Sequence, residues 1–213
     1  MQEWRISMKT KKLDLLPLKA LKVNDFFWNK YTGLVTKEII PYQWKALNDE
    51  VADAEPSYCI DNFKVAAGLK EGTFHGWVFQ DTDLAKWLEA VAYSLSYEPN
   101  EALEKLADDA IELVGKAQQE NGYINTHFTI LHPGKQYCNL KEGHELYTTG
   151  HFIEAAIAYY EVTGKDKFLN IMKKNADLIC DVFHTEKYKN AVPGHEEIEL
   201  ALMKLATITG DDK

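Results

Sequence analysis

Two histidines in this sequence stand in the same local setting. Each is the middle residue of a Gly-His-Glu triplet, at residues 143–145 and 194–196, and the triplets are about 50 residues apart, the length of one helical hairpin. Each begins a predicted helix, where the helix dipole disfavours the charged imidazolium and keeps the ring a neutral donor and acceptor. Neutral rings suit hydroxyl groups, so His144 and His195 predict a binding site for them. Alternatively, both histidines serve only as helix caps.

The element that must hold the first histidine is a long apolar helix, residues 142–164. Leu146 and Ile153 follow helical spacing, and Phe152 and Tyr159 cover the opposite side. A helix that is apolar all round is a buried helix. Its polar residues gather in the first two turns, so we expect a central helix whose N-terminal end opens on a polar site.

Apolar and amphipathic helices alternate along the chain. The predicted order is buried, exposed, buried, exposed and buried, at residues 83–95, 101–117, 146–162, 165–183 and 198–206. This order is typical of helical hairpins with one layer facing an axis and the other facing water. We therefore expect an all-α chain that forms about half of an (α/α)6 toroid. Its inner helices run in one direction, so Asp81, Asp83, His144 and His195 should meet at one mouth.

The toroid also predicts which side chains water reaches. Trp87, Ile157 and Leu202 lie on predicted inner helices, and we expect them to be nearly inaccessible. Glu104 and Lys173 lie on the outer faces of the amphipathic helices, and we expect them to be exposed.

The segments before and between these helices are less regular. Residues 1–23 are expected to form an edge segment, followed by a helix that Pro41 interrupts. Such a break could turn Gln43 into a pocket; alternatively, Gln43 faces solvent. Residues 123–133 should form a loop with a possible short strand, and the last helix should begin at Pro193.

Residues 48–80 are predicted to form a long irregular loop that is rich in glycine and aromatic residues. A loop of this length inside a compact domain is usually functional. Its aromatic side chains are Phe63, Phe74, Trp77 and Phe79. Sugar rings present apolar CH faces that stack on flat side chains, so the loop could form a carbohydrate surface. Alternatively, the aromatic residues fasten the loop to the core.

The composition narrows the class of ligand. The 213 residues include 24 Lys and Arg against 33 Asp and Glu, which gives a formal net charge of −9, and the pI is near 5.3. Neither nucleic acid nor an anionic membrane is an expected partner, because both require a basic patch. No apolar run approaches the roughly 18 residues that cross a bilayer. The N-terminus lacks a signal peptide's apolar core, so we expect a cytoplasmic protein.

The three cysteines, Cys59, Cys138 and Cys180, are too far apart for a CxxC metal or redox pair. Free thiols in a reducing compartment are the simplest interpretation. The alternative is a nucleophile or a zinc thiolate, but neither has a local partner in the sequence. We therefore expect no metal site in this chain.

The end of the chain repeats an earlier turn. Residues 161–168, EVTGKDKF, lead from an inner helix into an outer one, and residues 208–213, ITGDDK, have the same register. The chain stops where another outer helix should begin, so we expect residues 24–213 to be the N-terminal half of a truncated barrel. Its open edge, with Ile198, Leu202 and Leu205 lacking outer partners, predicts possible self-association.

Five motifs, in this order, resemble the N-terminal part of the β-L-arabinofuranosidase family, glycoside hydrolase family 127. They are DNF at 61–63, FQDTDLAKWLEAVAYSL at 79–95, AQQENGYINTHF at 117–128, GHELYTTGHFIEAAIAYYEVTG at 143–164 and PGHEEIELALMKL at 193–205. The similarity runs from about Asp25 to the end. It implies an (α/α)6 catalytic barrel with added β-domains, of which residues 24–213 would be the N-terminal half.

The resemblance also implies that the catalytic residues and the substrate-binding residues lie in different parts of the family's barrel. Family members remove β-L-arabinofuranosyl units with retention, using a zinc-held cysteine thiolate as nucleophile and a glutamate as acid/base. No position in this chain matches those residues, so we expect no catalytic residue here, and zinc only in the full-length family. The wall of the substrate pocket does carry over. The residues that would bind a small carbohydrate substrate are His144, His195, Gln43, Asn62 and Asp83.

Two other functions stay open from the sequence. One is a non-catalytic sugar-binding or assembly fragment whose missing half is another chain. The other is a different α/α-toroid enzyme, such as an unsaturated glucuronyl hydrolase or a sugar epimerase. A basic subsite for a uronate would favour the glucuronyl hydrolase, and the sequence shows none at the mouth. Turnover of an aryl β-L-arabinofuranoside, as opposed to binding alone, would separate a glycosidase from a fragment.

Overall fold

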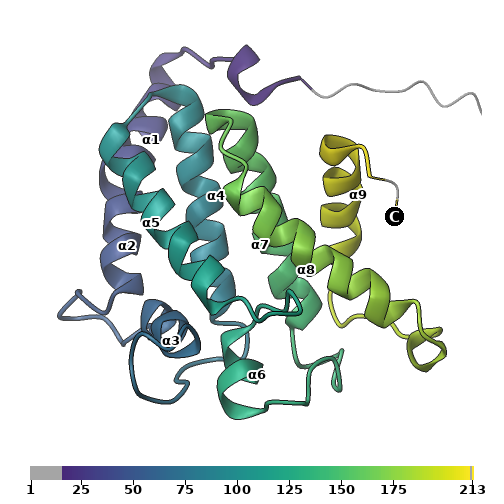
Figure 1. Ribbon diagram of the computed structural model, residues 1–213. Helices are drawn as coiled ribbons and strands as arrows, with labels where there is room; N and C mark the ends of the chain where they lie inside the picture. The colour runs from purple at the N-terminus through teal and green to yellow at the C-terminus, as the bar shows by residue number, and fades with distance from the viewer. Residues whose placement is uncertain (1–15, 212) are drawn as a thin grey trace, which may run out of the picture.

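The computed structural model describes residues 16–211 and 213, and within these residues the chain is helical, without strands (Figure 1). The α-helices are α1 Phe26–Leu34, α2 Ile40–Leu47, α3 Cys59–Ala66, α4 Asp81–Tyr97, α5 Glu101–Ala117, α6 Thr126–Leu131, α7 Glu145–Thr163, α8 Lys167–Phe183 and α9 Ile198–Thr209. Short helical turns occur at η1 Leu18–Ala20, η2 Val35–Ile39 and η3 Glu186–Tyr188. The predicted all-α class is confirmed. None of the described helices is long and apolar enough to cross a membrane.

Helix α7 forms the centre of the fold and packs between α4 and α9 (Figure 1). Buried side chains cover all its sides, with Phe152, Ile153 and Tyr159 at most 1% exposed. Helix α4 contributes Leu84 and Leu88, which are fully buried. The three helices run in the same direction, so their N-terminal ends lie at the same end of the molecule (Figure 1).

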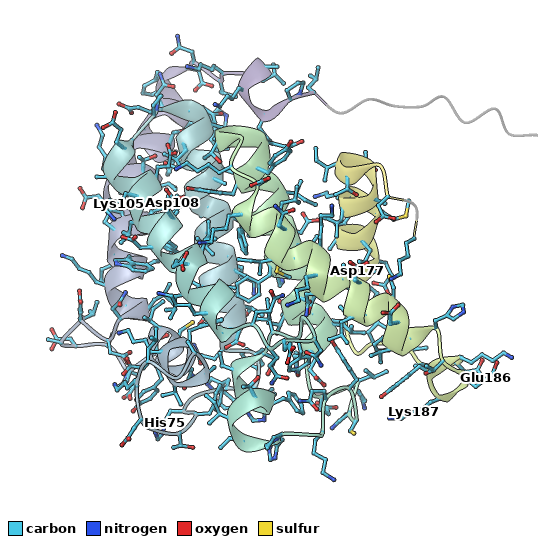
Figure 2. The ribbon with its side chains drawn as sticks, viewed as in Figure 1. His75, Lys105, Asp108, Asp177, Glu186 and Lys187 are labelled. Carbon is cyan, nitrogen blue, oxygen red and sulfur yellow. The ribbon has the colours of Figure 1, made fainter. Side chains whose placement is uncertain are left out.

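Helices α5 and α8 form the outer layer. Helix α5 is amphipathic: it buries Ala107 and Ile111, while Lys105 lies on its exposed side (Figure 2). There the Lys105 side chain pairs with that of Asp109 at 2.9 Å. The two outer helices are joined through Gln118, whose side-chain N–H donates to a backbone carbonyl of α8 at 2.9 Å. Inner helices α4, α7 and α9 with outer helices α5 and α8 form part of an α/α toroid, as the alternation predicted.

The accessibility predictions are confirmed in part. Trp87 is 2% exposed and Ile157 is 7% exposed, as expected for inner helices. Leu202, Glu104 and Lys173 are half-buried, so the expectation for these three was wrong. Glu104 is partly covered because Lys165 pairs with it at 2.6 Å, while Leu202 and Lys173 line a groove between α8 and α9.

The predicted break at Pro41 does not occur. The chain continues from α1 through the π-helical turn η2 into α2, whose first residues include Pro41. A π turn accommodates the missing proline N–H without ending the helix. Of the expected edge segment 1–23, residues 1–15 lie outside the described part, and Leu18 packs against the core.

Three further boundaries differ from the predictions. Residues 48–80 are not wholly irregular, because they contain α3. The segment 123–133 forms α6 instead of a strand, since the Asn125 side chain accepts a hydrogen bond from the N–H of Phe128 and caps the helix. Helix α9 begins at Ile198 and not at Pro193, because Gly194 is tied to another loop.

The burial of α7 generates a stability prediction. Replacing Ile153 by Ala leaves a cavity at a fully buried position, which should lower the free energy of unfolding by about 2–4 kcal/mol. Leu200→Ala on α9 is the control, because Leu200 is 55% exposed and its loss should cost less than about 0.5 kcal/mol. Chemical denaturation measures both. Equal losses would contradict the central position of α7.

Candidate functional site

The two Gly-His-Glu turns lie against each other at the N-terminal ends of α7 and α9. The backbone N–H of Gly194 donates to the carbonyl O of Leu140 at 3.0 Å. The ring centroids of His144 and His195 are 4.6 Å apart, and the ring planes are inclined by 39°. His144 is half-buried and His195 is exposed. The structure thus brings the two repeated histidines together, and their role in sugar binding stays a prediction.

Two glycines make this close approach possible. A Cβ atom on Gly194 would lie 2.1 Å from the carbonyl O of Lys141, which is too close for any side chain. A Cβ atom on Gly150, one turn into α7, would lie 2.6 Å from Cγ of Glu197. The segment before α9 therefore rests directly on the backbone of α7 and of the loop before it.

His144 is held in an unusual backbone conformation. Its φ of +55° is in the left-handed region, which disfavours a residue with a side chain. The next residue, Glu145, is 3% exposed and is anchored on both oxygens. Tyr123 Oη donates to Oε1 at 2.5 Å, and the N–H of Tyr137 donates to Oε2 at 2.8 Å. Burial raises the pKa of Glu145, while these hydrogen bonds lower it.

The contacts of the His144 ring indicate its tautomer. Nδ1 lies 2.7 Å from the carbonyl O of Glu142. A carbonyl oxygen only accepts, so Nδ1 must carry the proton. In the neutral ring, Nε2 is then an acceptor that can receive a hydrogen bond from a hydroxyl group.

Tyr147 extends the histidine pair into the molecule. Its ring centroid lies 5.0 Å from that of His195 and 6.0 Å from that of His144. Lys86 on α4 donates a hydrogen bond to the Tyr147 hydroxyl at 3.2 Å, and its ammonium group lies 5.2 Å from the ring centroid. Tyr147 therefore links α4 to the two histidines.

His151 follows Tyr147 by one turn of α7, and their ring centroids are 4.5 Å apart. Its Nδ1 is 3.4 Å from Oε1 of Glu197, just before α9. Burial, assisted by the positive charge of Lys86, lowers the pKa of His151 to about 4. The ring is neutral at physiological pH, so its contact with Glu197 is not an ion pair.

Tyr147 and His151 were not among the residues predicted to form this site. Their spacing could have identified them, because they follow His144 by three and seven residues and so share one side of α7. Helical spacing alone did not show that this side faces the mouth, since every side of α7 carries apolar residues.

The two aspartates at the start of α4 have different environments. Asp81 is 1% exposed and accepts hydrogen bonds from the N–H and the hydroxyl of Thr126, at 2.7 and 2.5 Å. Burial raises its pKa to about 6. Asp83 is exposed and accepts a hydrogen bond from Nε2 of Gln80 at 2.7 Å. Asp81 thus fastens α6 to α4, and Asp83 is the aspartate that a ligand can reach.

Gln43 and Asn62 do not join the histidine cluster through any hydrogen bond within the described residues. Gln43 is exposed on α2. Asn62 on α3 is 1% exposed, and its amide is occupied by the backbone of His75. The side-chain N–H donates to the carbonyl O of His75 at 2.8 Å, and the side-chain oxygen accepts from its N–H at 3.0 Å. Asn62 therefore holds the loop before α4.

The described residues do not fit a zinc ion. Among them, no group of three or more His, Cys, Asp and Glu side chains could hold a metal. The three cysteines are free and differ in exposure: Cys59 is buried, Cys138 is exposed and Cys180 is partly exposed. Burial raises the pKa of the Cys59 thiol well above its usual value, which disfavours the thiolate that zinc requires.

Comparison with known proteins identifies relatives over nearly the whole chain. A family model described as the catalytic domain of the GH127 β-L-arabinofuranosidases matches residues 20–213. A curated relative, the non-reducing end β-L-arabinofuranosidase of Bifidobacterium longum subsp. longum, is 39% identical over an alignment that covers 88% of this chain and 31% of the relative.

Solved structures agree with the sequence match. A crystal structure of a GH127 β-L-arabinofuranosidase from Geobacillus stearothermophilus T6 superposes with a TM-score of 0.87 at 55% identity, covering 90% of this chain and 30% of that one. A second GH127 β-arabinofuranosidase gives 0.81 at 34% identity, covering 92% and 31%. This chain thus spans about a third of the length of these relatives.

The close contact at Gly194 is testable by substitution. Gly194→Ala should lower the free energy of unfolding by about 1–3 kcal/mol and move His195 away from His144, because the added Cβ meets backbone atoms. Gly33→Ala is the matched control, since a Cβ on Gly33 in α1 meets nothing within 4 Å and should raise stability slightly. Denaturation measures stability, and contacts between the histidine rings in NMR spectra report their separation. An unchanged ring separation would refute this account.

The environment of His151 predicts a pH dependence. Its folded pKa, about 4, is below the unfolded value near 6.5, so the unfolded state binds more protons between these pH values. This residue should make stability fall as the pH drops from 6.5 towards 4, and His151→Gln should reduce that fall. Lys86→Met should raise the His151 pKa in an NMR titration. A wild-type pKa near 6.5 would contradict the proposed burial of the neutral ring.

Proposed function

The chain belongs to glycoside hydrolase family 127, and from this premise we propose that it forms the substrate-pocket wall of a β-L-arabinofuranosidase acting on arabinofuranosyl units of plant-type glycans. The observation that carries the proposal is the pair of rings of His144 and His195, with centroids 4.6 Å apart at the meeting ends of α7 and α9. Asp83 supplies an exposed carboxylate at the N-terminal end of α4. Each of these groups can exchange hydrogen bonds with a sugar hydroxyl.

The tautomer of His144 supports a neutral ligand. Its Nδ1 proton is directed to the carbonyl O of Glu142, which leaves Nε2 to accept from a hydroxyl group. His195 is exposed beside His144 and can contact the same sugar. The contribution proposed for Gln43 is the same kind of contact from α2, where its amide is exposed.

We propose that this chain binds the sugar without cleaving it. A retaining glycosidase needs a nucleophile and an acid/base on opposite sides of the scissile bond. The family uses a zinc-held cysteine, and the described residues do not fit zinc. The chain's own residues therefore bind and orient the arabinofuranosyl unit, and the reacting groups belong to the later part of the family's barrel.

A second candidate is an assembly fragment that works with another chain or a second copy. Exposed apolar side chains on α9 favour it, because Leu200 is 55% exposed and Met203 is 69% exposed. Faces of this kind promote self-association.

We also propose a cytoplasmic location. The three free cysteines support it, because thiols stay reduced in that compartment.

The proposed function predicts separate results for binding and turnover. His144→Ala and His195→Ala should each weaken binding of an aryl β-L-arabinofuranoside roughly tenfold, the loss of one or two hydrogen bonds. His184→Ala is the control, because this histidine is exposed at the end of α8. Calorimetry measures the binding affinity, and light scattering measures the mass of the protein in solution, which distinguishes a monomer from a self-associated form. We expect no hydrolysis with or without zinc, and clear turnover by a monomer would refute the proposal.

A further inference from the structure

Aromatic rings continue from the histidine pair towards solvent. The ring of Phe79 lies 5.2 Å from that of His144, between centroids. Trp77 lies beyond it, with its ring stacked on that of Phe79 at 6.1 Å and the planes inclined by only 5°. Trp77 is 70% exposed and Phe79 is 38% exposed. The exposed aromatic surface of Trp77 and Phe79 is thus continuous with the ring of His144.

The loop that carries these rings is fixed on the side towards α4. Gly76 has a φ of +93°, and a Cβ there would lie 2.7 Å from Oε1 of Gln80. The side chain of Gln80 is buried and binds at both ends: Oε1 accepts from the N–H of Trp77 at 3.3 Å, and Nε2 donates to Asp83 at 2.7 Å. The loop therefore turns tightly around one glutamine.

Asn62 fixes the same loop on its other side. Its amide makes two hydrogen bonds with the backbone of His75, which lies two residues before Trp77 (Figure 2). The His75 ring also lies 5.0 Å from that of Tyr58, between centroids. A buried residue of α3 thus holds an exposed tryptophan in place, although the cost of exposing that ring to water favours burying it.

We propose that Trp77 and Phe79 form a second saccharide subsite, which binds the sugar unit linked to the one bound at the edge of the His144 and His195 pair. This inference rests on the proposed function. The CH face of a sugar ring covers an exposed aromatic ring, while its hydroxyl groups stay in water or reach a neighbouring acceptor. Asp83 is that acceptor, because it is exposed and bound to the same Gln80 that positions the Trp77 backbone.

The chemistry around the rings favours a sugar over an apolar partner. An apolar protein surface would bury the charged Asp83 carboxylate with the Gln80 amide as its one hydrogen-bond donor among the described residues, which is costly. A sugar hydroxyl donates to it directly. Asn62 is then a positioning residue for this subsite, which it would affect through the backbone of His75 without touching the sugar.

Two probes test the subsite: methyl β-L-arabinofuranoside and the corresponding β-L-arabinofuranosyl disaccharide. Calorimetry on the full chain should give a disaccharide affinity roughly two- to tenfold above that of the monosaccharide, as expected for one added stacking contact. Trp77→Ala should abolish this difference and leave the monosaccharide affinity unchanged. Trp77→Phe should retain part of it. Trp28→Ala is the control, because Trp28 is a 55% exposed tryptophan on α1.

The outcomes separate this inference from the function on which it rests. If the monosaccharide binds and the disaccharide has no advantage, the subsite is refuted and the proposed function stands. If neither probe binds the wild-type chain, both are refuted. Circular dichroism and thermal unfolding check the variants, and Trp77→Ala should unfold like the wild type because the ring is mostly exposed. Equal weakening of both probes by Trp77→Ala would also overturn the subsite.

Discussion

The geometry of the site depends on the contact of Gly194 with the backbone of Lys141. Only a residue without a side chain can lie there, since a Cβ would come within 2.1 Å of a carbonyl oxygen. This contact places the segment before α9 on the loop before α7, and so brings His195 to His144. The site is therefore a product of backbone packing as much as of histidine chemistry.

Buried polar groups keep that packing in place. Glu145 joins Tyr123 and Tyr137 at the start of α7, and Asp81 joins α6 to α4. Each is a carboxylate removed from water and satisfied by donors from a distant segment, an arrangement that is costly to disturb because a lost partner leaves a buried charge. The Glu145 anchor follows His144 directly and so helps to hold its left-handed conformation.

The exposed surface complements these buried anchors. From His195 through His144 and Phe79 to Trp77, rings lie side by side within 4.6 to 6.1 Å, between centroids. Imidazole rings at one end and flat aromatic faces at the other suit a chain of neutral sugars. The negative net charge of the protein is consistent with such a ligand, because hydroxyl groups do not require a basic surface.

The sequence by itself determined the helical class, the alternation of inner and outer layers and the two histidines at one mouth, because these follow from helical periodicity and from a repeated triplet. The predicted break at Pro41 was wrong, because the π-helical turn before it lets the helix continue. The predicted full burial of Leu202 was also wrong, because the exposure of a side chain depends on its neighbours in space. Only the tertiary structure decided that Asn62 holds a loop and that His151 and Tyr147 join the site. Those roles depend on contacts between distant segments, which local spacing does not encode.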